Sequence, residues 1–261
     1  MLQGLLSQRG ASGLVLINDT LEQRGRLIAD SFANTWAIRG HNVHILSYDR
    51  EESIIRKCFP PSTIDRIFIH DAFCAPAKCS PSTWVEQFSK ETEPFTMVID
   101  SLSTALVYHP FDDIYVGLLC LLRKIKSLQI IVALLHADVH EEHEVDKLCY
   151  LATTTLAPYV RDGGSTLGCK TVHRKPGGRV VREDEEFVLK PDLSITDIKK
   201  VAEKHDAKPV TQQPDPTANL TFNLRLSEEE KVAKDNLVLP YLKTASSSKG
   251  RGDHIRHGAG G

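Results

Sequence analysis

The segment FTMVIDSLSTALVYH, residues 95–109, decides the fold of this chain. It starts with an unbroken apolar run at residues 97–99, which is followed by Asp100 and then by small polar residues. An apolar run without alternation is typical of a central parallel strand, because both faces of such a strand are buried. In nucleotide-binding α/β proteins, the first carboxylate after such a strand orients a magnesium ion or a water. Asp100 is therefore the first candidate site residue.

Outward from this strand, the first 156 residues alternate between strand-like and helix-like segments. We expect strands at 13–17, 42–47, 66–70 and 129–135, and helices beginning near residues 20, 84, 112 and 144. This alternation predicts a mostly parallel sheet with helices on both faces. Thr20 and Gln23 fit a capping box, so the first helix is expected to begin there. The last helix is expected to span residues 144–156.

The sequence pattern changes after Pro158. Two β-like segments, 166–174 and 179–189, are joined by KPGG at 175–178, which is a strong hairpin signal. The domain is therefore expected to cover residues 1–190 and to end in an antiparallel addition. Beyond it we expect a charged linker or weak helix at 191–214, an edge strand and a helix at 215–242, and a disordered tail at 243–261.

The composition is that of an ordinary globular chain. Its 261 residues are 41% hydrophobic and 25% charged, with a net charge of −2. A net charge this small creates no overall electrostatic field that would hold nucleic acid. Any contact with RNA therefore has to come from a local basic patch. No apolar run reaches the ~18 residues of a membrane span. The N-terminal residues lack a secretory pattern, which predicts a cytoplasmic and nuclear location with the six cysteines reduced.

A phosphate-binding loop would be expected after the first strand of such a sheet. The P-loop pattern G-x-x-x-x-G-K-[ST] wraps backbone amides around phosphate, neutralises it with lysine and holds magnesium with a hydroxyl. Here Gly25 is kept and Arg26 supplies a positive charge. Thr20 replaces the first glycine, however, and Leu27 has no hydroxyl for a metal. We favour an ordinary strand-to-helix connection over a degraded loop that binds nucleotide weakly, which makes Asp100 a hydrogen-bonded carboxylate at a strand end.

Two further clusters contain side chains that bind metals in other proteins. His136, His140 and His143 lie close together, but their spacing differs from H-E-x-x-H. Cys74 and Cys79 have no second pair at a metal-site spacing. A structural zinc site needs four convergent ligands and a catalytic one needs three, so we expect neither a metal nor a cofactor. The sequence contains no G-x-S-x-G motif, and no nucleophile with a base and an orienting acid stands out.

The predicted hairpin collects basic side chains. The candidate RNA contacts are Arg174, Lys175, Arg179 and Arg182. An exposed basic turn can bind phosphate groups and so adds affinity that salt weakens. The acidic run at residues 183–186 offers the alternative of a solvated, charge-balanced turn.

Several segments resemble known families. VIDSL at residues 98–102 is similar to the second nucleotide-site strand of RecA-type ATPases. DPTANLTFNLRLSEEEKVAKDNLVLPY at residues 215–241 closely resembles the C-terminal motif of the Elongator complex subunit five family. The segments GLVLI, VHIL and LLHADVHEEH agree in order with that family. The resemblance covers nearly all of residues 1–242.

The resemblance implies a RecA-like sheet flanked by helices, without a working P-loop and with a C-terminal strand-helix extension. Subunits of this kind assemble with two paralogues, Elongator subunits four and six, into a hexameric ring. That ring is an accessory part of Elongator, which modifies the wobble uridine of certain tRNAs, whereas the acetyltransferase chemistry belongs to a different subunit. The chain is thus expected to be a non-catalytic ring subunit that meets tRNA through the assembled ring. The alternative is an active RecA-like ATPase related to recombination or clock proteins, and hydrolysis at composite ring interfaces also stays open.

The segment 215–242 is expected to dock on a partner, because an isolated strand and helix have little core of their own. The side chains expected to make this contact are apolar: Leu220, Phe222, Leu224, Leu226, Leu237, Leu239 and Tyr241.

Overall fold

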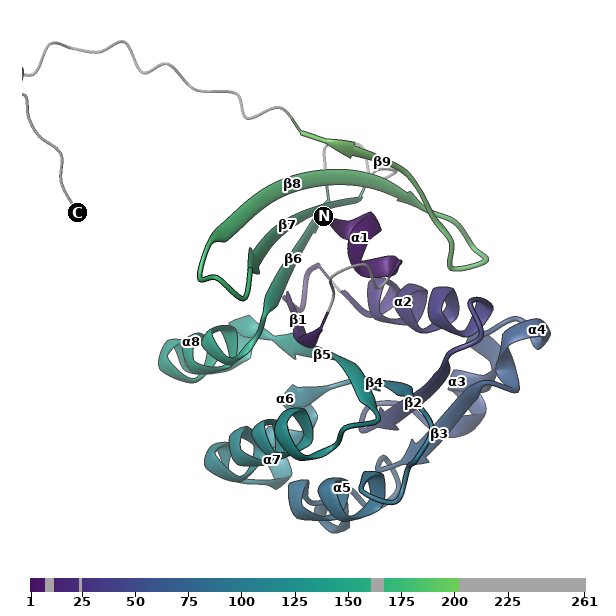
Figure 1. Cartoon of the computed structure of the whole chain (residues 1–261), viewed down its shortest axis with the longest axis vertical. Helices are drawn as coiled ribbons and strands as arrows, with labels where there is room; N and C mark the ends of the chain where they lie inside the picture. The colour runs from purple at the N-terminus through teal and green to yellow at the C-terminus, as the bar shows by residue number, and fades with distance from the viewer. Residues whose placement is uncertain (8–11, 24, 161–166, 202–261) are drawn as a thin grey trace, which may run out of the picture. The chain divides into compact units, whose positions relative to one another are not determined.

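The computed structural model describes residues 1–7, 12–23, 25–160 and 167–201, which form a layered α/β domain (Figure 1). The strands are β1 Gly13–Asp19, β2 Asn42–Ser47, β3 Ile67–Asp71, β4 Phe95–Ile99, β5 Leu128–His136, β6 Thr154–Val160, β7 Leu167–Arg174, β8 Val180–Leu189 and β9 Ile195–Lys200. The helices are α1 Leu2–Leu6, α2 Arg26–Ile38, α3 Glu52–Cys58, α4 Pro61–Ile64, α5 Pro81–Phe88, α6 Leu102–Tyr108, α7 Phe111–Lys124 and α8 Glu142–Leu151. Two 3-10 turns are η1 Pro76–Lys78 and η2 Ala137–Val139.

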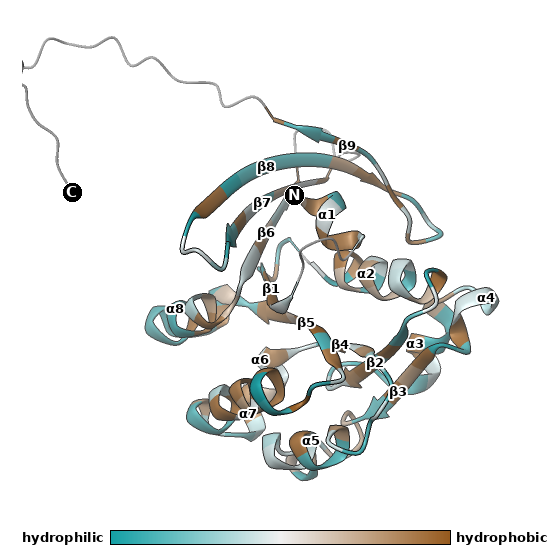
Figure 2. Ribbon diagram, viewed as in Figure 1, coloured by the Kyte–Doolittle hydropathy of each residue, from teal (hydrophilic) through white to brown (hydrophobic). Residues whose placement is uncertain are grey.

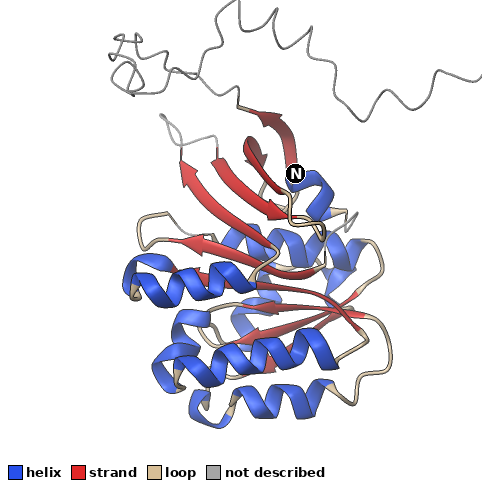
Figure 3. Cartoon of the chain, turned by 60° about the vertical axis from the view of Figure 1, so that its left-hand side comes forward, coloured by secondary structure: helices blue, strands red, loops and turns tan. Residues whose placement is uncertain are grey.

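One sheet runs through this part of the chain in the order β3-β2-β4-β5-β1-β6-β7-β8-β9. The first six strands of this order, from β3 at the edge to β6, are parallel to one another. From β6 onward, β6, β7, β8 and β9 pair antiparallel. Figure 3 shows the antiparallel strands extending away from most of the helices, with α1 beside them. The predicted mostly parallel sheet with an antiparallel hairpin at one end is confirmed.

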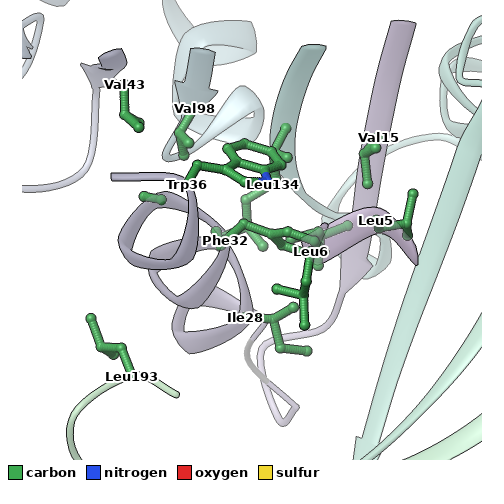
Figure 4. Packing of buried hydrophobic residues seen from close by; sticks show 14 of the residues in the cluster. Leu5, Leu6, Val15, Ile28, Phe32, Trp36, Val43, Val98, Leu134 and Leu193 are labelled. Atoms are coloured by element: carbon green, nitrogen blue, oxygen red, sulfur yellow. The ribbon is translucent and has the colours of Figure 1, made fainter. Parts of the chain in front are cut away.

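The parallel strands are buried on both faces, which is why they do not alternate in sequence. On β1, Val15 and Ile17 face the cluster formed with α1 to α4, whereas Leu14 and Leu16 face the cluster formed with α5 to α8. Figure 4 shows the first cluster, in which Trp36 of α2 lies between the helix and the strands. Apolar residues run along the central strands, and the middle of β8 is hydrophilic (Figure 2). Among the described helices, none has the length and apolar content needed to cross a bilayer.

The first long helix begins later than the capping box predicts. α2 starts at Arg26, and Thr20 closes a tight turn instead, since its Oγ1 accepts a hydrogen bond from the Gln23 amide at 3.0 Å. The physical reason is the approach of Gly25 to β1, where a Cβ would come within 2.4 Å of the Ile17 Cγ2 atom. The chain therefore has to pass the end of β1 before it can turn into a helix.

Residues expected to end a helix form a strand instead. α8 ends at Leu151 rather than at residue 156, and β6 follows at once. The run of three threonines at 153–155 is β-branched and packs well on a pleated surface. Pro158 lies beyond Leu156, the last β6 residue paired with β1, so its missing amide costs no hydrogen bond to β1.

The segment expected to be a linker or a weak helix at 191–214 begins with strand β9, which pairs with β8 as far as Lys200. Ile195 and Ile198 both pack toward the core although they are three residues apart. Asp197 between them has a φ of 54°, which breaks the strand alternation and gives the pair a spacing that resembles a helix. Residues 202–214 lie outside the described part of the chain.

Candidate functional site

The carboxyl ends of β1, β4 and β5 meet at one edge of the sheet and bring together the residues that a nucleotide site would use. β1 lies between β5 and β6, and β5 lies between β4 and β1. Asp19 ends β1, Asp100 follows β4, and His136 ends β5 in register with Asp19. Ligands of open α/β sheets bind at this edge.

Asp19 closes the connection between β1 and α2. Its Oδ2 atom accepts a hydrogen bond from the backbone amide of Gly25 at 2.7 Å. Its Oδ1 atom lies 2.5 Å from the Nδ1 atom of His136. Burial raises the pKa of Asp19, and the contacts with Gly25 and His136 oppose that rise. The carboxylate therefore has both oxygens engaged inside the protein.

A second carboxylate accepts a hydrogen bond from another backbone amide of the connection between β1 and α2. Asp138 of η2 accepts a hydrogen bond from the backbone amide of Leu21 at 3.0 Å. In a P-loop, amides of the corresponding connection and the first turn of the helix point at phosphate oxygens. Here Asp19 and Asp138 accept hydrogen bonds from the amides of Gly25 and Leu21, so two donors of the connection are already occupied by carboxylates of the chain.

The last two P-loop positions, Arg26 and Leu27, also differ from those of a working site. Arg26 forms an ion pair with Asp49, which follows β2. Leu27 is 53% exposed and offers no oxygen for a metal. The four degenerate positions named from the sequence, Thr20, Gly25, Arg26 and Asp100, thus engage partners within the chain.

Asp100 is 2% exposed and holds the end of β2. Its Oδ1 atom accepts a hydrogen bond from the Tyr48 amide at 2.6 Å, and its Oδ2 atom accepts one from the Ser47 hydroxyl at 3.2 Å. The Arg50 guanidinium lies 3.6 Å from Oδ2 and donates two hydrogen bonds to Asp30 of α2, at 2.8 and 2.9 Å. Burial raises the pKa of Asp100, and the Tyr48 amide and Arg50 oppose the rise. The geometry is that of a buried structural carboxylate.

The three histidines of the expected cluster have three different partners. His136 contacts Asp19, His140 lies 2.8 Å from the Ser103 hydroxyl, and His143 lies 3.1 Å from Glu141. Burial lowers the pKa of His140. Over the described ranges, no group of three histidine, cysteine, aspartate or glutamate side chains is arranged to hold a metal.

The hairpin forms as predicted, with β7 and β8 joined by a turn in which Gly178 has a φ of 81°. Lys175, Arg179 and Arg182 are exposed. Arg174 is half-buried, and its guanidinium donates a hydrogen bond to the Tyr150 carbonyl at 2.8 Å. Three of the four candidate contacts are therefore accessible, and the fourth is held against α8. The candidate docking residues between 220 and 241 lie outside the described residues.

Sequence reasoning missed the parts played by His136 and Asp138 and overlooked Tyr150 entirely. A carboxylate at the end of β1 and a histidine at the end of β5 were the available signal, and they become informative only once β1 and β5 are known to be neighbours.

A parallel sheet of this order with helices on both faces is a RecA-like α/β domain. It is similar to the flagellar accessory protein FlaH from Methanocaldococcus jannaschii, with a TM-score of 0.55 and 14% identity over 73% of this chain and 90% of that one. It is also similar to the ATPase domain of G40P, with a TM-score of 0.52 and 12% identity over 72% of this chain and 85% of that one. At these identities the likeness shows the fold alone.

The chain belongs to the family of Elongator subunit Iki1, whose family model matches residues 1–162 and 158–257. It is 30% identical over 259 residues to Elongator complex protein 5 of Danio rerio, covering 93% of this chain and 86% of that protein. It is 30% identical over 271 residues to Elongator complex protein 5 of Homo sapiens, covering 92% and 86%. The resemblance found in the sequence is confirmed.

Proposed function

We propose that this chain is a non-catalytic subunit of Elongator that forms a hexameric RecA-like ring with two paralogous subunits, Elongator subunits four and six. In this proposal the ring supports wobble-uridine modification of tRNA in the cytoplasm and nucleus. The observation that carries the non-catalytic assignment is the contact of Asp19 with the Gly25 amide, because a carboxylate occupies a donor that phosphate would need. Family membership supports the assignment to the complex.

A nucleotide-binding measurement tests whether the chain is non-catalytic. We expect calorimetric titration of the purified chain with magnesium-ATP to give no saturable binding, because Leu27 supplies no metal ligand and Asp19 repels phosphate. Tight, magnesium-dependent binding would overturn the assignment and would favour the active ATPase instead.

An assembly experiment tests whether the chain forms a ring with the two paralogous subunits. Co-expression with the two paralogous subunits, followed by mass determination of the purified complex, should give a mixed ring. A chain that stays monomeric in the presence of both partners would refute the proposed ring.

Removing residues 216–241 should abolish assembly while the domain keeps its unfolding transition, since that segment is proposed as the docking element. Unchanged assembly would reject the docking role alone.

The basic hairpin is the proposed tRNA contact. Lys175, Arg179 and Arg182 are exposed around one turn, where they can reach phosphate groups together. Arg174 belongs to this proposal in a different role, because its position against Tyr150 leaves its guanidinium less free to meet phosphate.

A further inference from the structure

The antiparallel extension has two chemically different faces. Alternate residues of β7 and β8, including Cys169 and Phe187, are buried on the inner face. The residues between them point to the opposite, outer face. In register, Lys170 pairs with Asp184, and Arg174 pairs with Val180. The outer face is open to solvent, since Val180 is 40% exposed and Lys170 is exposed.

This alternation divides the acidic run at 183–186 between the two faces. Glu183 and Glu185 point inward, where they bind the Met1 amine at 2.5 and 2.6 Å. Asp184 points outward, and its carboxylate accepts a hydrogen bond from the Tyr159 hydroxyl at 2.6 Å. Half of the negative charge that adjoins the basic hairpin in sequence therefore lies on the other side of the sheet. The outer face is more basic than the sequence order indicates.

Tyr150, near the end of α8, presents its ring beside this face. Its side chain is 78% exposed, the highest value among the exposed large apolar side chains of the described residues. The Arg174 guanidinium lies 5.1 Å from the ring centroid, and its hydrogen bond to the Tyr150 carbonyl fixes it there. A cation held on one ring face orients the aromatic side chain and leaves the rest of the ring to a ligand.

A second aromatic ring lies further along β7. Lys170 is four residues from Arg174 on the same face, a separation of about 13 Å at strand spacing. Its ammonium lies 5.9 Å from the ring centroid of Tyr159. That ring lies across Gly168, where a Cβ would come within 2.1 Å of its Cζ atom. A hollow of about 580 Å³ opens here, lined by Ala157, Pro158, Tyr159, Lys170, Asp184 and Val201.

We infer that this outer face binds an unpaired stretch of RNA, with a base stacked on Tyr150. The phosphates of the strand would be held by Lys170 and the hairpin side chains Arg179 and Arg182. Aromatic rings beside basic groups are the usual means of binding single strands, because any unstacked base has a π face to offer. A separation of about 13 Å corresponds to about four stacked nucleotides at about 3.4 Å each.

A protein partner is the other class that an exposed tyrosine and arginine would suit. The outer face favours RNA because basic side chains, Lys170, Arg174 and Arg182, outnumber the acidic Asp184 and Glu186 on it. The inference rests on the proposed tRNA contact and deepens it. It names an unpaired segment as the ligand and Tyr150 as a contact residue outside the hairpin.

The test uses the full chain assembled with its two partners and compares Tyr150→Ala with Tyr150→Phe. Tyr108→Ala is a matched control, because that tyrosine is 50% exposed on α6. Fluorescence anisotropy would measure binding to a short unstructured uridine-rich strand and to an RNA duplex of the same length. Tyr150→Ala should weaken single-strand binding by roughly 5- to 100-fold. Tyr150→Phe, Tyr108→Ala and every duplex affinity should stay near the unmodified values.

Equal single-strand affinity for Tyr150→Ala and the unmodified ring would overturn the inference. Parallel losses on single strand and duplex would also overturn it, because they would show a general charge or folding effect. If Tyr150→Ala prevents ring assembly, the face is a protein interface and the inference is rejected. A ring that binds tRNA but ignores Tyr150 would refute this inference and keep the proposed function, whereas a ring that binds no RNA at all would refute both.

Discussion

The Oδ2 atom of Asp19 accepts a hydrogen bond of 2.7 Å from the backbone amide of Gly25, six residues further along the chain. This contact determines how the connection between β1 and α2 is held. The connection is stabilised from within the chain, by groups that the sheet itself brings together.

Asp19→Ala should destabilise the domain without creating a nucleotide site. The change leaves the buried Gly25 amide and the His136 ring without their acceptor, which costs about 1–3 kcal/mol of the free energy of unfolding. Asp19→Asn keeps an oxygen acceptor and should lose less. Urea unfolding gives the stability, and titration with magnesium-ATP gives the binding. Saturable nucleotide binding by Asp19→Ala would show that the carboxylate alone blocks a competent site.

Asp100→Ala should be far more costly than Asp49→Ala. Asp100 is buried, and its loss leaves the backbone amides of Tyr48 and Asp49 without their acceptor, at about 1–3 kcal/mol for each, whereas Arg50 keeps its pair with Asp30. Asp49 makes a partly exposed pair with Arg26, worth less than about 1 kcal/mol. Comparing the two free energies of unfolding separates a structural network from a surface ion pair. Equal losses would contradict the structural role given to Asp100.

The stability of the domain should fall as the pH drops from about 6.5 toward 4. Burial lowers the pKa of both His44 and His70 to about 4. The unfolded chain therefore takes up protons first, at about pH 6.5, so the stabilisation is complete above that pH and is lost as the pH falls toward 4. The two rings are 2.9 Å apart, nitrogen to nitrogen, and the Gln87 amide contacts His70 at 2.7 Å, which requires at least one unprotonated ring nitrogen.

The expected size of this effect is up to roughly 3 kcal/mol for each histidine. Urea unfolding at several pH values would measure it. His44→Phe should flatten the profile between pH 6.5 and 4, because it removes one of the two titrating groups. His143→Phe is the control, since that histidine is exposed. A profile in which both variants follow the unmodified chain would rule out the histidine pair as the cause.

Reversing the charge of Lys175, Arg179 and Arg182 together should weaken tRNA binding by the assembled ring. The exposed hairpin would lose three phosphate contacts, so the slope of log affinity against log salt should become shallower by about 2. A matched control reverses three exposed lysines elsewhere in the domain: Lys57, Lys90 and Lys126. If both triple variants weaken binding equally, the effect belongs to net charge and the hairpin is not a specific contact. Reversal at Arg174 should act differently, through the position of Tyr150.

Most of the fold could be predicted from local patterns, and the exceptions have physical causes. The apolar runs of β1, β4 and β5 specify buried parallel strands because burial on both faces removes alternation. β9 was missed because Asp197 shifts the phase of the strand, so its inward residues have a helical spacing. The late start of α2 depends on the close approach of Gly25 to Ile17, which the composition of the turn does not reveal.

The site was less predictable than the fold because it is made of long-range contacts. Asp19 and His136 are 117 residues apart and meet only because β1 lies beside β5. The missing hydroxyl at Leu27 predicted from the sequence that no P-loop works here. The contacts of Asp19 and Asp138 with the amides of Gly25 and Leu21 were not evident until the strand order was known. Tyr150 escaped notice for the same reason, since Arg174 reaches it only because the end of β7 pairs with the start of β6.

The hydrogen bonds of Asp19 and Asp138 to the connection between β1 and α2 have a consequence for the folded fraction of the subunit in a cell. A RecA-like domain that binds nucleotide gains stability in proportion to RT ln(1 + [L]/Kd), so its folded fraction follows the nucleotide supply. In this chain, which we propose binds no nucleotide, Asp19 and Asp138 contact the amides of Gly25 and Leu21 at fixed effective concentration. We expect its folded population, and with it the pool available to partners, to be the same in energy-rich and starved cells.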